Sequence, residues 1–416
     1  MLKKTTILLL ALGSWLLTPL NAQITFRGAW IATVANIDWP SAGSVGNTDK
    51  QQAEMLFLLD SLESIGINAI IFQVRPTADA LYRSSYEPVS HWLTGRQGSW
   101  PNEQSPWDPL QWTIEEAHKR NMEVHVWLNP YRVNLAKTDT SVIHAEHVFR
   151  KHPEWFWCYA KQWYFDPGLP TTREWICTIV QDIVSRYDIQ AIHMDDYFYP
   201  YPVGGQPLPD TKTFEKYPRG FEDIRNWRRN NVNLAIKAIS ETIKECKPEV
   251  EFGISPFGVW SNASVDSKGS KTQAGITNYD DLYADIRLWI KEGWIDYVLP
   301  QLYWEIGKKA ADYEVLAHWW ANEVRGTKCK LYIGMAPYRL ENASAKTSWG
   351  KGNEIGRQMK LNRTIPEISG ECFYSTRPLL RNPRGVCDTI QHIYKDDTAK
   401  RNISAIDQPA MEGHKE

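Results

Sequence analysis

The chain has 416 residues, and its 47 basic and 49 acidic side chains leave a formal net charge of −2. This balance gives no electrostatic reason to expect a nucleic-acid partner. Hydrophobic residues make up 43% and charged residues 23% of the chain, which is typical of a globular protein and excludes a disordered one. The length allows one large domain or two of ordinary size.

The first residues have the order of a secretory signal. Lys3 and Lys4 precede an apolar run at 7–17, and "LNA" at 20–22 resembles a small-residue cleavage site. The apolar run is too short to cross a membrane comfortably. We therefore expect a signal peptide at 1–22 and an exported mature chain, periplasmic or extracellular, with no transmembrane segment.

The mature chain repeats a pattern of a short apolar strand, a loop rich in polar and aromatic residues, and an amphipathic helix. The segments that read as strands are 27–34, 69–76, 123–130, 191–198, 251–260, 296–304, 330–338 and 371–378. Apolar residues recur at helical spacing in 50–66, 107–121, 220–246, 280–293 and 352–363. Asp108 is a candidate N-cap, and Gly66 and Gly293 are candidate helix ends.

Eight strand–helix units in a chain of this length predict an α/β fold, a single (β/α)8 TIM barrel over residues 23–395. A doubly wound open sheet is the rival, but "VANIDWPSAGSVG" after the first strand lacks the GxGxxG of a nucleotide-binding turn. The loops after strands two and four, 77–106 and 199–219, are long, and such loops are uncommon unless functional. A polar tail at 396–416 is expected to fray.

Candidate site residues follow from the barrel, because enzymes of this fold keep their sites where the carboxyl ends of the strands meet. Polar and aromatic side chains occupy the expected strand ends, and their convergence on one mouth indicates a site. They are Trp30, Gln73, Arg75, Trp127, Asn129, His193, Asp195, Asp196, Tyr197, Gln301, Tyr303, Trp304, Glu305 and Tyr338. Asp166, in "YFDPG", is a further candidate that equally suits a turn cap.

Asp195 and Asp196, in "AIHMDDYFYP", are the strongest candidates for catalysis. Glycoside hydrolysis needs one acid to protonate the leaving oxygen and a second carboxylate to stabilise or attack the sugar, or to activate water. With Glu305, this pair supplies those groups without a cofactor or a metal. We expect Asp195 to point inward and stay ionised, and Asp196 to favour its protonated form beside that charge. An ordinary solvated turn is the alternative for the pair.

Twenty tryptophans and nineteen tyrosines are the most distinctive feature of the composition. Most of these rings are expected in the core, but rings at strand ends offer faces on which the C–H groups of a sugar stack. Trp127, Tyr197 and Trp304 are predicted to be such surfaces. Two other candidates have open structural alternatives, since Arg75 also suits a salt bridge at the barrel end and His193 a hydrogen bond in the core.

The six cysteines show no CxxC or zinc-like spacing. Their even number permits disulfides in an oxidising compartment, with Cys372 and Cys387 as the first pair to test. Separate buried thiols are an equally good interpretation.

Several longer stretches also resemble a known family. They are "FRGAWIATVANIDWPS" (26–41), "IIFQVRPTADALYRSSYEP" (70–88), "VHVWLNPYR" (124–132), "YFDPG" (164–168), "IHMDDYFYP" (192–200), "ISPFGVW" (254–260) and "PQLYWEIG" (300–307). In this order they are similar to the bacterial glycosyl-hydrolase-like family related to glycoside hydrolase family 10.

The resemblance implies an exported barrel protein that acts on a polysaccharide. Some members are lipoproteins that cleave peptidoglycan glycan strands already stripped of their stem peptides. By this resemblance the substrate is a bacterial wall glycan or another amino-sugar polymer. The chain departs from the lipoprotein members because no cysteine stands near the expected cleavage site.

Two other function classes remain open. A carbohydrate-binding barrel protein without catalysis would use the same aromatic residues. A metal-dependent hydrolase such as a deacetylase would use His193 and Asp195 as ligands, but the chain has no HExxH and the first strand has no HxH. The sequence indicates neither the sugar linkage nor the oligomeric state.

Overall fold

The computed structural model describes residues 23–100, 107–134 and 140–406. The expected signal peptide lies outside these residues, so it stays a prediction. No helix in the described part of the chain is long and apolar enough to cross a membrane.

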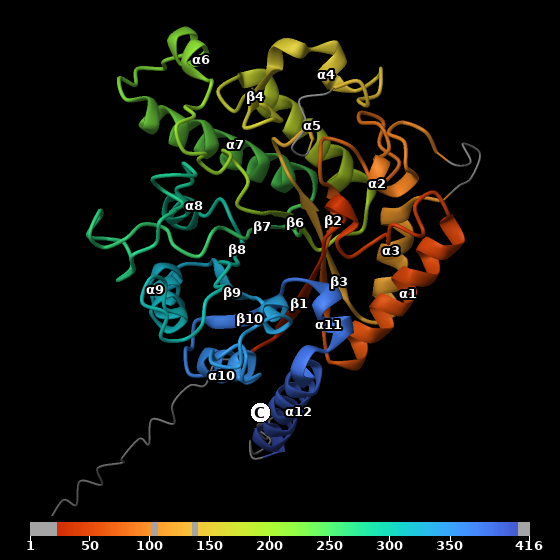
Figure 1. Cartoon of the computed structure of the whole chain (residues 1–416), viewed down its shortest axis with the longest axis vertical. Coiled ribbons are helices and arrows are strands. Elements are labelled where there is room, and N and C mark those ends of the chain that lie inside the picture. The colour runs from red at the N-terminus through yellow and green to blue at the C-terminus, as the bar shows by residue number, and fades with distance from the viewer. Residues whose placement is uncertain (1–22, 101–106, 135–139, 407–416) are drawn as a thin grey trace, which may run out of the picture.

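Eight parallel strands close into a barrel at the centre of the molecule, in the order β1-β10-β9-β8-β7-β6-β3-β2 (Figure 1). They are β1 (Phe26–Ile31), β2 (Ala69–Arg75), β3 (Glu123–Leu128), β6 (Ala191–Met194), β7 (Glu251–Ile254), β8 (Tyr297–Val298), β9 (Lys330–Met335) and β10 (Ile368–Phe373). Each expected strand contributes one of them. The predicted (β/α)8 barrel is therefore confirmed, and the closed sheet excludes the doubly wound alternative.

Helices surround the barrel, with α1 and α3 on one side, then α5 and α7, then α8 and α9, and α10 and α12 completing the ring (Figure 1). Their bounds are α1 (Thr48–Ser64), α3 (Pro109–His118), α5 (Pro170–Arg186), α7 (Ile224–Cys246), α8 (Ile286–Lys291), α9 (Tyr313–Val324), α10 (Glu354–Asn362), α11 (Thr376–Arg381) and α12 (Val386–Ile406). The Asp108 carboxylate accepts hydrogen bonds from two backbone N–H groups of α3 and is its N-cap. Gly66 and Gly293 follow helices with φ of +87° and +67°, as expected of residues that end a helix.

Aromatic rings fill the interior of the barrel. Phe26 and Tyr332 stack with ring centroids 4.2 Å apart, and the ring of Tyr297 on β8 lies against the adjacent strand β7. A Cβ on Gly253 of β7 would lie 1.8 Å from the Tyr297 ring. The glycine therefore makes room for this ring, and the barrel is packed through its centre.

Each barrel strand ends earlier than the segment that was predicted for it, and one further pair of strands was not predicted. β8 covers only Tyr297–Val298, because Pro300 has no N–H to continue the ladder. A hairpin of β4 (Phe156–Tyr159) and β5 (Gln162–Phe165) was not expected. The two turn residues, Ala160 and Lys161, have positive φ. Asn-Gly is the usual sequence for such a turn, so Ala-Lys gives no signal of it.

The connections after the strands carry further short elements. Residues 77–106 include α2 (His91–Thr94), with 101–106 outside the described residues, and 199–219 include α6 (Thr211–Lys216). A third long connection follows β3 and carries α4 (Val148–Lys151), η2 (Pro153–Trp155) and the hairpin.

The first part of the expected fraying tail, residues 396–406, is helical, and residues 407–416 lie outside the described residues. The boundary expected at Asp396 falls inside α12, which continues to Ile406. All six cysteines are free thiols, so the suggested Cys372–Cys387 disulfide is absent.

Candidate active site

Asp195 directly follows β6 and points into a buried network of hydrogen bonds. Nδ2 of Asn129 donates to both carboxylate oxygens, at 2.8 and 2.7 Å, and the backbone N–H of Tyr197 donates to Oδ1 at 3.2 Å. Burial raises the pKa of Asp195, while the charge of Arg132 and the Asn129 amide oppose this shift. The pKa of Asp195 is therefore raised overall, by less than burial alone would cause.

Two further side chains fix the Asn129 amide. Its Oδ1 accepts hydrogen bonds from Nε2 of Gln73 at 2.6 Å and from Nη2 of Arg132 at 3.0 Å. Because both groups are donors, the amide must present its own N–H groups to Asp195. The orientation of the Asp195 carboxylate is thus set by one residue of β2 and two residues that follow β3.

Asp196 is buried beside Asp195 but has different partners. The Tyr201 hydroxyl donates to its carboxylate. Burial and then the charge of Asp195 raise the pKa of Asp196 to about 7, although Tyr201 and Gln301 favour its ionised form. Two adjacent carboxyl groups in one site therefore differ in their readiness to hold a proton.

Three candidates from the sequence are almost completely buried inside the barrel. His193 is fully buried, and its ring nitrogens contact the hydroxyls of Tyr297 and Ser255 at 2.9 and 2.8 Å. Trp30 and Trp127 are 2% and 5% exposed and belong to the packed interior. Strand alternation turned these side chains inward, so His193 takes its core alternative and Trp127 is not an exposed stacking surface.

Three other polar candidates are bound within the protein. Both oxygens of Glu87 accept hydrogen bonds from the Arg75 guanidinium, at 2.6 and 2.7 Å, with both side chains buried. Gln73 is fully buried, and its Oε1 accepts two backbone N–H bonds. The Asp166 carboxylate accepts hydrogen bonds from the backbone N–H of Gly168 and from the Thr213 hydroxyl, so it caps a turn, as the alternative interpretation expected. All three side chains therefore have hydrogen-bond partners within the protein.

Aromatic residues surround the carboxylates on the other side of the mouth. Tyr303 lies within 6.1 Å of Tyr338 and 6.0 Å of Tyr374, measured between ring centroids. Tyr338 and Tyr197 are each 37% exposed, so their rings are open to a ligand. Trp304 is partly buried and meets Phe257 edge-on.

Gln301 and Glu305 follow β8. The Gln301 amide donates to the carbonyl of Ser255 at 2.9 Å. Glu305 is half-buried on the turn that follows. A hydrogen bond from the backbone N–H of Ile306 to the Glu354 carboxylate, at 2.8 Å, stabilises this turn. Because β6 and β8 are parallel, Glu305 and the two aspartates follow strand ends on the same side of the barrel.

Sequence reasoning missed several residues of this network. Arg132 stands three residues after Asn129 in "VHVWLNPYR", and Tyr201 closely follows the aspartates. Glu87 and Tyr374 are far from Asp195 and Asp196 in the sequence, and only the fold brings them near the site. The described residues contain no group of three or more His, Cys, Asp or Glu side chains arranged to hold a metal.

Comparison with known proteins assigns the chain to a family. The profile of the family described as "Glycosyl hydrolase-like 10" matches residues 25–350. Glycosyl hydrolase YngK of Bacillus subtilis is 48% identical over 89% of this chain and 72% of its own length. Glycosyl hydrolase DigH of Escherichia coli K12 is 41% identical over 86% of this chain and 84% of its own length.

Two solved structures share the fold at low sequence identity. The glycoside hydrolase domain of PgaB from Bordetella bronchiseptica has a TM-score of 0.52 and 10% identity, and the match covers 89% of this chain and 99% of that domain. Alpha-L-fucosidase isoenzyme 2 of Paenibacillus thiaminolyticus has a TM-score of 0.53 and 15% identity, over 91% of this chain and half (50%) of that one. The chain described here is a glycoside hydrolase of the glycosyl hydrolase-like 10 family.

Proposed function

We propose that this enzyme cleaves O-glycosidic bonds of a bacterial amino-sugar polysaccharide, with the glycan strands of peptidoglycan as the leading substrate. The observation that carries the proposal is the buried pair of Asp195 and Asp196. One carboxylate is held by the Asn129 amide, and the other has a pKa raised to about 7. The exposed rings of Tyr197 and Tyr338 offer stacking surfaces for sugars.

Two catalytic schemes use these groups differently. In the first, an aspartate faces the anomeric carbon while Glu305 gives a proton to the leaving oxygen. In the second, Asp195 orients the acetamide of an N-acetylated sugar, whose oxygen attacks the anomeric carbon as Asp196 protonates the leaving oxygen. Water then opens the cyclic intermediate and returns a proton to Asp196. The raised pKa of Asp196 favours the second scheme.

The substrate is tested by digestion of intact and of amidase-treated peptidoglycan, with the products read by mass spectrometry. We expect short saccharides to be released, and faster from strands without stem peptides. If the protein binds the glycan but cleaves neither preparation, a binding protein without catalysis becomes the better interpretation.

The scheme is tested with an inhibitor and a variant. If the acetamide assists, a sugar thiazoline inhibits strongly and Glu305→Gln retains substantial activity. If Glu305 is the acid, this variant loses about 10²–10⁴-fold on substrates with poor leaving groups.

We also propose that the enzyme works outside the cytoplasm, on the basis of the charged, apolar and small-residue order of its first residues. Cell fractionation of the full-length chain, with sequencing of the mature amino terminus, tests this proposal.

A further inference from the structure

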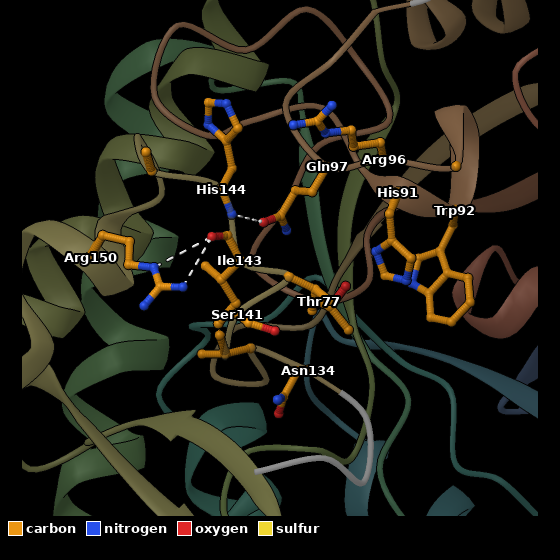
Figure 2. Close-up of a pocket in the computed structure, with 14 residues that line it drawn as sticks. Thr77, His91, Trp92, Arg96, Gln97, Asn134, Ser141, Ile143, His144 and Arg150 are labelled. Atoms are coloured by element: carbon orange, nitrogen blue, oxygen red, sulfur yellow. Dashed lines mark hydrogen bonds between the residues drawn. The ribbon is translucent and has the colours of Figure 1, made fainter. Parts of the chain in front are cut away.

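A pocket of about 760 Å³ lies between the loop after β2 and the loop after β3. Figure 2 shows the rings of His91 and Trp92 on one side and Arg150 on the opposite side, with Thr77 between them. Apolar side chains such as Val133 and Ile143 complete the wall. A cavity of this size has room for one or more sugar units.

The pocket is lined by cations and by no carboxylate of the described residues. The Arg96 side chain is exposed and makes no hydrogen bond or ion pair within the described part of the chain. Arg150 is held at the wall by the carbonyl of Ile143, at 3.4 and 3.3 Å. These two guanidinium groups favour an anionic ligand.

One carboxylate lies behind this wall. Asp79 is fully buried, and His91 contacts it at 3.5 Å. Thr77 and Gln97 each donate a hydrogen bond to Asp79 at 3.0 Å. The negative charge of Asp79 is therefore satisfied by its neighbours, whereas the charge of Arg96 remains available at the surface.

The pocket shares a wall with the active site. Two of its lining residues, Thr77 and Val133, directly follow Pro76 and Arg132. Arg132 donates to the Pro76 carbonyl at 3.0 Å and to Asn129, which in turn holds Asp195. The pocket therefore lies next to the residues that hold Asp195, on the β2 and β3 side of the barrel.

We propose that this pocket is a subsite for a carboxylate-bearing sugar residue of the same glycan, away from the bond that is cleaved. The carboxylate pairs with Arg96, and the sugar ring packs between Trp92 and the apolar wall. The proposal rests on the proposed function, because it takes the ligand to be part of the polysaccharide substrate. Specificity then depends on the charge along the glycan as well as on the sugar at the cleaved bond.

The test measures binding to the full chain carrying Asp195→Asn, so that the ligand is not consumed. The probes are peptide-free peptidoglycan oligosaccharides with native carboxylates and the same oligosaccharides with these groups reduced to alcohols. We expect Arg96→Ala to weaken binding of the native glycan about tenfold and to leave binding of the reduced glycan unchanged. Arg96→Lys should restore part of the loss, and high salt should shrink the difference.

Lys328→Ala is the matched control, because this exposed cation precedes β9 at the opposite end of the barrel. The proposal is overturned if Arg96→Ala binds the native glycan as tightly as the parent, or if the parent does not distinguish the two glycans. If the unsubstituted enzyme cleaves no glycan but binding still depends on Arg96 and the carboxylate, the proposed function fails and the subsite stands. Cleavage without any dependence on Arg96 refutes the subsite alone.

Discussion

Asp195 and Asp196 are consecutive in the chain, yet their partners differ in kind. Asp195 accepts three hydrogen bonds from N–H groups, and the positive Arg132 lies near it. Asp196 has the Tyr201 hydroxyl and the negative charge of Asp195. At the scale of single residues, the donors around Asp195 oppose the effect of burial on its pKa, whereas the charge of Asp195 adds to the effect of burial on the pKa of Asp196.

The raised pKa of Asp196 predicts how stability depends on pH. The ordinary value of 3.8 becomes about 7 in the folded protein, so the folded state binds this proton more tightly than the unfolded state. The free energy of unfolding therefore falls as pH rises from about 4 to about 7. Asp196→Asn removes this loss, and we expect the variant to be more stable than the wild type at pH 8 by roughly 1–4 kcal/mol.

Urea unfolding at pH 4.5 and at pH 8 measures the effect, which should be much smaller at the lower pH. Asp188→Asn is the control, since the side chain of Asp188 is 85% exposed. A stability difference for Asp196→Asn that is the same at both pH values contradicts the assignment.

Asn129 is predicted to be a positioning residue. Asn129→Ala removes two donors from Asp195 and releases Gln73 and Arg132. We expect kcat to fall roughly 10–100-fold with a smaller change in KM, because the carboxylate loses its fixed orientation. The apparent pKa in the pH–rate profile that reports Asp195 and Asp196 should also shift.

Asn68→Ala separates this effect from a loss of stability. Asn68 makes two comparable hydrogen bonds to the backbone, at 2.8 and 2.9 Å, at the other end of the barrel. It should lower stability and leave kcat unchanged. Equal losses of kcat in the two variants would mean that Asn129 acts only through folding.

At the scale of elements, β7 and β8 fit together through the Tyr297 ring. Its hydroxyl contacts His125 and His193 at 2.8 and 2.9 Å, and the ring fills the space above Gly253. One side chain of the shortest strand, β8, thereby contacts β7, β6 and β3.

Gly253→Ala is predicted to destabilise the fold. The added Cβ would meet the Tyr297 ring at 1.8 Å, and overpacking of this kind typically costs about 1–3 kcal/mol or more. Thermal or denaturant unfolding measures the loss. Gly275→Ala is the control, since a Cβ added there would have no atom within 4 Å, and an equal loss in both variants would contradict the packing argument.

Much of the barrel could be predicted because its strands are apolar runs that alternate with amphipathic helices. The hairpin of β4 and β5 could not, because Ala160 and Lys161 give no turn signal. Alternation also predicted that Asp195 shares a face with His193, but it does not say how deep a residue lies. In the structure His193 and Trp127 are buried inside the barrel, whereas Tyr197, which lies beyond the end of β6, is partly exposed to solvent. Alternation alone could not distinguish these positions.

At the scale of the whole molecule, α12 joins the end of the chain to the barrel. Arg363 of α10's C-terminal end contacts Glu371 of β10 at 2.9 Å and Asp397 of α12 at 2.6 Å. Tyr394 of α12 also donates to Glu371, at 3.2 Å. Glu371 is fully buried, so its charge depends on these partners.

Arg363→Ala is predicted to cost roughly 3–5 kcal/mol in unfolding free energy, because Glu371 would be left as a buried charge without a cation. Arg381→Ala breaks a 3.3 Å pair with Glu341 at the surface and should cost at most about 1 kcal/mol. Denaturant unfolding of both variants gives the comparison. A similar small loss in each would show that α12 is not held by this network.

The central claim is that the fold exists to present Asp195 and Asp196 to a glycosidic bond. The most direct test is the rate at which Asp195→Asn and Asp196→Asn cleave amidase-treated peptidoglycan, measured on protein whose circular dichroism matches the wild type. Each variant should lose at least about 10²-fold in kcat, because in the proposed function each aspartate acts in the transition state. Full activity in both variants would contradict the account and leave the pair as a structural turn.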